Sequence, residues 1–177
     1  ASVLDPQMMA HLKGWQPIER LNFDSMLTWV FRAVKKAPRR RGQLTHGVLT
    51  VYWLVGANGR EDLPPAIYQG RRAHFKRQLR NLKKTALIPE LRKVTGLLLE
   101  AGFVSKPEFG WYAVQEPVGI TLEKWAQRNQ GEIMPARVWP LVNAIFKAMM
   151  VLERNGMITQ DFSDKNVIIN GTEKHPI

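Results

Sequence analysis

The residues of this chain that could act together in chemistry lie in one short stretch, residues 152–170 (LERNGMITQDFSDKNVIIN). In it, Asp161 is followed after four residues by Asn166, and an apolar run begins directly afterwards. A carboxylate can accept the proton of an attacking hydroxyl group, and an amide oxygen is a suitable ligand for a magnesium ion. A short connection favours the presentation of both groups to one bound substrate. Because this spacing occurs often by chance, the elements around it decide its meaning.

Those elements are predicted to be a long helix before the stretch and a strand after it. In residues 136–154, apolar side chains recur at intervals of three and four, which predicts a helix, and Gly156 should end it. The apolar run 167–169 indicates a strand. Upstream, residues 111–116 are predicted to be a strand and residues 121–129 a helix that begins at a threonine cap.

The order of helix, glycine, Asp-x4-Asn and strand resembles the catalytic loop of the protein-kinase-like superfamily. This resemblance implies that Asp161 is the catalytic base, that Asn166 binds Mg²⁺ and that Lys165 approaches the transferred phosphate of ATP. The superfamily's His-Arg before the aspartate is replaced here by Thr159 and Gln160. The implied activity is transfer of the γ-phosphate of ATP to a hydroxyl acceptor.

Residues 111–122 (WYAVQEPVGITL) are similar to the strand, the hinge and the start of the next helix in such proteins. The resemblance implies that the backbone from Glu116 to Val118 pairs with the adenine edge. Residues 72–107 are similar to the small lobe of atypical bacterial kinases of the lipopolysaccharide-kinase type. By that resemblance Lys76, on a strand, contacts the nucleotide phosphates and Glu90, on a helix, pairs with it. Other lysines compete for the first role: Lys83, Lys84 and Lys93.

Two features depart from the superfamily pattern. No glycine-rich G-x-G-x-x-G loop is found, and the chain ends before the position of the Asp-Phe-Gly element, which supplies a second magnesium ligand. The interpretation is a fragment or a natural kinase-like remnant, and without that aspartate the chain should be nearly inactive.

The predicted fold is α+β and two-lobed: a small antiparallel β lobe with one helix, and a helical second lobe that is truncated or minimal. Residues 1–45 are expected to form an arm and an amphipathic helix, residues 46–118 the small, nucleotide-binding lobe, and residues 119–177 the start of the large lobe. The further elements expected from the residue pattern are a helix at 22–36, strands at 48–55, 66–69 and 72–78, and helices at 79–84 and 89–101.

The charge of the chain suggests a second class of function. The net charge is +11, and residues 71–93 contain nine Lys or Arg and one Glu. A cluster of this kind is typical of contact with a polyanion, nucleic acid or anionic lipid, or of a solvated surface. Residues 80–88 and 98–106 also resemble the helix-into-wing junction of winged-helix proteins. A nucleic-acid-binding module and a non-catalytic kinase-like scaffold are therefore the alternatives.

Composition excludes several classes of protein. The chain has no cysteine, four scattered histidines and 45% hydrophobic residues, so disulfide frameworks, thiolate metal sites and intrinsic disorder are not expected. No apolar run is long enough for a membrane span, and the first residues do not form a signal peptide. These features favour a cytoplasmic location.

Overall fold

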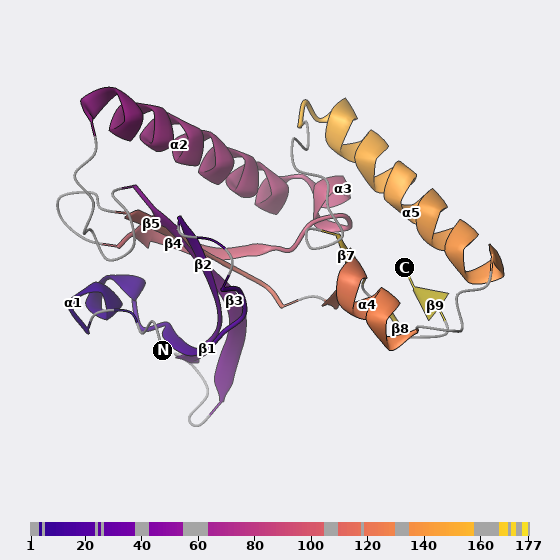
Figure 1. Cartoon of the computed structure of the whole chain (residues 1–177), viewed down its shortest axis with the longest axis horizontal. Helices are drawn as coiled ribbons and strands as arrows, with labels where there is room; N and C mark the ends of the chain where they lie inside the picture. The colour runs from indigo at the N-terminus through magenta and orange to yellow at the C-terminus, as the bar shows by residue number, and fades with distance from the viewer. Residues whose placement is uncertain are drawn as a thin grey trace. The chain divides into compact units, whose positions relative to one another are not determined.

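The computed structural model describes residues 4, 6–23, 25, 27–37, 43–54, 64–104, 110–117, 119–129, 135–157, 167–169, 171–172 and 175–176. They divide into two units: residues 1–87 with 96–117, and residues 88–95 with 118–177. The order of elements along the chain is shown in Figure 1. None of the described helices combines the length and the apolar character that a membrane crossing needs.

The first unit is built on a five-stranded antiparallel sheet in the order β1-β2-β3-β5-β4. Its strands are β1 (Gln16–Arg20), β2 (Thr28–Lys36), β3 (Leu44–Trp53), β4 (Leu98–Phe103) and β5 (Gly110–Gln115). Helix α1 (Pro6–Met9) and the 3-10 helix η1 (Ala10–Leu12) cover one face, and helix α2 (Pro65–Leu87) covers the other (Figure 1).

The core of this unit lies between the sheet and its N-terminal cover. Alternate residues of β3 are buried there, and Leu49, Val51 and Trp53 have no exposed surface. Leu12 and Trp15 pack against them from the other side. Gly47 is needed for this contact, because a Cβ atom there would lie 2.5 Å from Val114 Cγ1 and 2.9 Å from the Trp15 ring. The strands predicted at 48–55 and 111–116 are confirmed as β3 and β5.

The helix expected at 22–36 is wrong, because the chain forms β2 there. Trp29, Phe31 and Ala33 are buried while Arg32 between them is exposed, which is the two-residue period of a strand with one face in the core. The same apolar residues also fit a helical spacing, and the pairing of β2 with β3 along its whole length decides between the two.

Two more expectations fail in the next segment. The strands expected at 66–69 and 72–78 are part of α2, whose composition of Arg, Lys, Gln, Leu and Ala is that of a helix former. The helix expected at 89–101 is shortened to α3 (Pro89–Arg92), and β4 follows it. Gly102 lies inside β4, where a Cβ atom would be 2.9 Å from the Tyr112 ring.

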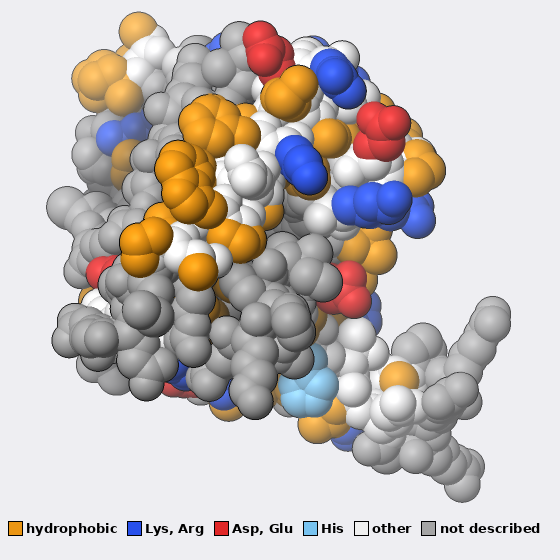
Figure 2. Space-filling model, turned by 90° about the vertical axis from the view of Figure 1, so that its right-hand side faces the viewer, with side chains coloured by type: hydrophobic (Ala, Val, Ile, Leu, Met, Phe, Trp, Pro, Cys, Tyr) orange, Lys and Arg blue, Asp and Glu red, His pale blue; other side chains and the backbone are white. Residues whose placement is uncertain are grey.

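The second unit contains the helices α3, α4 (Leu122–Arg128) and α5 (Pro135–Arg154). Among its described residues there are also two small two-stranded sheets: β6 (Ile120–Thr121) pairs with β7 (Ile168–Ile169), and β8 (Gly171–Thr172) pairs with β9 (His175–Pro176). Its core consists of Trp125, Leu141 and Ile169. The helix predicted at 136–154 is confirmed. Large apolar side chains remain exposed on α5: Trp139, Phe146 and Met150. Hydrophobic side chains also gather on the face drawn in Figure 2.

Candidate functional site

The described residues on either side of positions 158–166 belong to the second unit, and their backbone groups are hydrogen-bonded there. At its start, Gly156 has a left-handed φ of 67°, and the backbone N–H groups of Gly156 and Met157 donate to the carbonyl oxygens of Glu153 and Leu152. This pattern is a Schellman motif, and it ends α5 as the glycine predicted. At the other end, Ile168 and Ile169 pair with Thr121 and Ile120.

The strand pair β6–β7 is continued by a further backbone hydrogen bond. The N–H of Leu122, the first residue of α4, donates to the carbonyl oxygen of Val167 over 2.8 Å. Thr121 caps α4, with its hydroxyl oxygen accepting from the Lys124 N–H at 3.2 Å, as the sequence predicts. Val167, the residue after Asn166, is therefore hydrogen-bonded to Leu122. Leu122 follows the expected hinge by only a few positions. Asp161, Lys165 and Asn166 themselves lie outside the described residues.

The expected hinge follows the last residue of β5. The backbone N–H of Glu116 donates to the Leu97 carbonyl oxygen over 2.8 Å, and its side chain is exposed. Glu116 belongs to the first unit, while Val118 lies outside the described residues. The chain thus passes from one unit to the other where the hinge was predicted.

Lys76 and Glu90 belong to different units. Lys76 is exposed on α2, which is a helix and not the expected strand, and Glu90 is exposed on α3 in the second unit. The relative placement of the units is not determined, so their pairing stays a prediction. The resemblance implies a lysine on a strand and a glutamate on a helix. The strand β3 (LTHGVLTVYW) has no lysine and the helix α2 has neither Asp nor Glu, so these two elements offer no other candidates for that pair.

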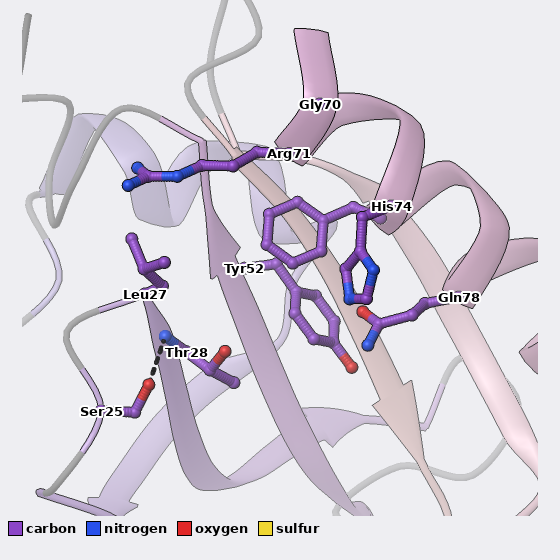
Figure 3. Close-up of a pocket in the computed structure, with 9 residues that line it drawn as sticks. Ser25, Leu27, Thr28, Tyr52, Gly70, Arg71, His74 and Gln78 are labelled. Atoms are coloured by element: carbon purple, nitrogen blue, oxygen red, sulfur yellow. Dashed lines mark hydrogen bonds between the residues drawn. The ribbon is translucent and has the colours of Figure 1, made fainter. Parts of the chain in front are cut away.

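A hollow of about 490 Å³ opens on the α2 face of the sheet (Figure 3). Its lining comes from three places: the turn before β2, the end of β3 and the N-terminal half of α2. Tyr52 packs on Phe75 with ring centroids 5.1 Å apart, and burial raises the pKa of its phenol. Arg71 donates from Nη1 to the Leu54 carbonyl oxygen at 3.1 Å. The Gln78 side-chain oxygen is buried without a hydrogen-bond partner.

The polar residues that line this hollow are Ser25, Thr28, Tyr52, Arg71, His74 and Gln78. Their side chains are mainly hydrogen-bond donors or neutral acceptors, and none of the lining residues carries a carboxylate. Within the described part of the chain, no group of three or more His, Asp or Glu residues could hold a metal ion. The hollow can therefore hold a polar ligand, but its lining does not match the ligand set of a magnesium ion.

An ion-paired cluster on the opposite face of the sheet was missed by sequence analysis. Lys35 of β2 and Lys13 both contact Glu100 of β4, at 2.8 and 3.1 Å. Burial by itself would raise the pKa of Glu100, but the hydrogen bonds from the two lysines outweigh it and lower the pKa. Burial and the nearby Glu100 charge raise the pKa of Tyr112 to about 12. No sequence signal joins residues 65 positions apart, because the sheet pairing alone brings them together.

Comparison with known proteins identifies the fold. No protein-family model matches the chain, and no curated protein matches it. Among solved structures it is similar to the kinase domain of PF14_0431, with a TM-score of 0.68 at 12% sequence identity, over 96% of this chain and 43% of that one. The chain therefore spans less than half the length of that protein chain. The α+β arrangement of a five-stranded antiparallel sheet with a covering helix, followed by a helical unit, is a kinase-like fold.

Proposed function

We propose that this chain is a kinase-like phosphotransferase that moves the γ-phosphate of ATP to a hydroxyl acceptor. The observation that supports the proposal most directly is the pairing of β6 with β7, continued by the hydrogen bond from Leu122 to Val167. This pairing joins the residues that directly follow Asn166 in the sequence to the residues that follow the expected hinge. The kinase-like fold gives this motif the context that the spacing alone lacks.

In this proposal Asp161 accepts the proton of the acceptor hydroxyl, the acceptor oxygen bonds to the γ-phosphorus, and the β–γ bridging oxygen leaves with ADP. Lys165 compensates the charge of the transferred phosphate. In kinase-like proteins Mg²⁺ neutralises phosphate charge, and Asn166 is the residue proposed to hold it here. The described residues do not supply a metal site, so no step is assigned to the ion.

The test is phosphate transfer by the Asp161→Asn variant, measured as ADP release from ATP with a panel of sugar, lipid-headgroup and peptide hydroxyl acceptors. Asp164→Asn is the matched control, because it removes the same charge three residues away in the same segment. We expect at least about a hundredfold loss for Asp161→Asn and a much smaller loss for Asp164→Asn. Equal and measurable rates in the wild type and the Asp161→Asn variant would refute the role of this carboxylate, whereas no ADP release by the wild type would refute the phosphotransferase proposal.

The second candidate function is a non-catalytic kinase-like scaffold. It is favoured by one observation, the absence of a lysine from β3 and of a carboxylate from α2. Such a scaffold should neither gain thermal stability on addition of ATP nor release ADP. The winged-helix alternative has no support from the fold, because residues 98–103 form the edge strand of the five-stranded antiparallel sheet of a kinase-like fold.

A further inference from the structure

Helix α2 carries a continuous cationic face on the side that points away from the sheet. The helix contains seven Lys or Arg and no Asp or Glu. Phe75 and Thr85 are buried against the unit, which sets the inner side of the helix. At 100° per residue, the outer side is then the one that presents five exposed cations: Lys76, Arg77, Arg80, Lys83 and Lys84. We call these five residues the α2 cationic face.

Within the residues that the structure describes, four of the five cations of this face are not neutralised by an ion pair. Within the described part of the chain, Lys76, Arg77, Arg80 and Lys83 form no ion pair, whereas Arg32, Lys13 and Lys35 of the same unit each do. Like charges three and four residues apart on a helix repel each other by a few tenths of a kcal/mol per pair. A bound polyanion would reduce this repulsion between the cations.

We infer that the α2 cationic face binds the phosphodiester backbone of double-stranded nucleic acid, independently of base sequence. The five residues span eight helical steps, about 12 Å along the helix axis. A duplex carries one negative charge per about 1.7 Å of its axis, so an equal length presents roughly seven phosphates. The charge densities of the two arrays are therefore comparable, with five cations facing roughly seven phosphates over the same length.

The residue types on this face favour a duplex over the other polyanions. A helix that inserts into a membrane surface needs apolar side chains beside its cations, but the apolar side of α2 is used by the sheet, where Phe75, Leu79 and Leu82 contact Tyr52 and Trp111 around a small cavity. A single strand is held by stacking of its bases on aromatic side chains, and the α2 cationic face has no aromatic residue.

The experiment measures binding of the full chain to fluorescent 20-base-pair duplexes by anisotropy over a range of salt concentrations. The test variant is Arg77→Gln/Arg80→Gln/Lys83→Gln/Lys84→Gln, which leaves Lys76 in place. The matched control removes the same charge from exposed residues of α4 and α5, in the variant Lys124→Gln/Arg128→Gln/Lys147→Gln/Arg154→Gln. Circular dichroism and the melting temperature verify that both variants fold.

We expect wild type and control to bind both duplex DNA and duplex RNA, since only the shared backbone is contacted. The test variant should bind at least about tenfold more weakly, and the slope of log K against log salt should fall by about three to four. The single variant Arg80→Gln should lower that slope by about one, which keeps the inference testable if the fourfold variant does not fold.

Three outcomes would overturn the inference. The first is no duplex binding by the wild type at low salt. The second is an equal loss in the test and control variants, which would assign the binding to net charge alone. The third is binding of the wild type only to vesicles that contain phosphatidylserine, with the loss of that binding in the test variant, which would assign the face to a membrane.

Discussion

Leu122 and Val167, 45 positions apart, are joined by a backbone hydrogen bond of 2.8 Å. The bond joins the first residue of α4 to the residue that precedes β7. It therefore joins the segment after the expected hinge to Val167, the residue that follows Asn166 in the sequence. Next to this hydrogen bond in the sequence, Ile169 of β7 contributes the buried apolar side chain: it is 5% exposed and packs with Trp125 and Leu141.

Truncating Ile169 should therefore weaken the junction. We expect Ile169→Ala to destabilise the second unit by about 2–4 kcal/mol, because it leaves a cavity in a small core. Ile168→Ala is the matched control on the same strand; that side chain is 41% exposed, so its loss should cost under about 1 kcal/mol. Urea unfolding followed by tryptophan fluorescence measures both values. Similar costs for the two variants would contradict the packing described here.

The Glu100 cluster should make stability depend on pH. The folded-state pKa of Glu100 is lowered, so the cluster stabilises the fold above the unfolded-state pKa of a glutamate, and this stabilisation is lost as pH falls through the lowered value. We expect Glu100→Gln to cost about 1 kcal/mol at pH 7 and to flatten the acid side of the stability profile.

The control for that prediction is Glu19→Gln. Glu19 pairs with Arg32 at 3.3 Å, and both side chains are more than half exposed, so its removal should cost at most about 0.5 kcal/mol. Denaturant titrations between pH 3 and pH 8 compare the two variants. An unchanged profile in Glu100→Gln would show that the two lysines do not act on this carboxylate.

Two glycines should respond in opposite ways to the same substitution. Gly47→Ala should cost about 1–3 kcal/mol, because the new methyl group would overlap with Val114 and the Trp15 ring. Gly70→Ala, in α2, has no atom within 4 Å of its new Cβ and should gain about 0.5–1 kcal/mol from helix propensity. Melting temperatures of the two single variants should therefore move in opposite directions, and a common direction would contradict the arrangement at one of the two sites.

The side chain of Gln78 should be dispensable for stability. Its oxygen atom is buried without a partner, so Gln78→Leu removes an unsatisfied acceptor and should leave the protein equally stable or stabilise it by about 1 kcal/mol. The exposed Gln69 on the same helix provides the control, because Gln69→Leu should change stability by less than about 0.5 kcal/mol. A clear destabilisation by Gln78→Leu, measured by thermal unfolding, would mean that this oxygen has a partner in solution.

Sequence reasoning succeeded where the evidence is local. The spacing of apolar residues predicts α5, Gly156 predicts its end, Thr121 predicts the start of α4, and the β-branched and aromatic runs predict β3 and β5. Each of these depends on residues a few positions apart, and their interactions are the same in any fold.

Sequence reasoning failed where an apolar pattern fits both the helical period and the two-residue period of a strand. Residues 28–36 and 98–103 have spacings that suit a helix as well as a strand, and they become strands because β3 and β5 lie beside them and supply hydrogen bonds. Residues 66–69 and 72–78 were expected to be strands, yet both lie within the single helix α2, which packs on the sheet.

By itself, then, the amino-acid sequence determined the kinase-like resemblance, the Asp-x4-Asn spacing and the excess of positive charge. Only the tertiary structure decided that Lys35 and Lys13 meet Glu100, and that the cations of α2 share one outward face. Contacts between distant residues depend on strand pairing and on which side of a helix is buried, and neither quantity is set by near neighbours in the chain.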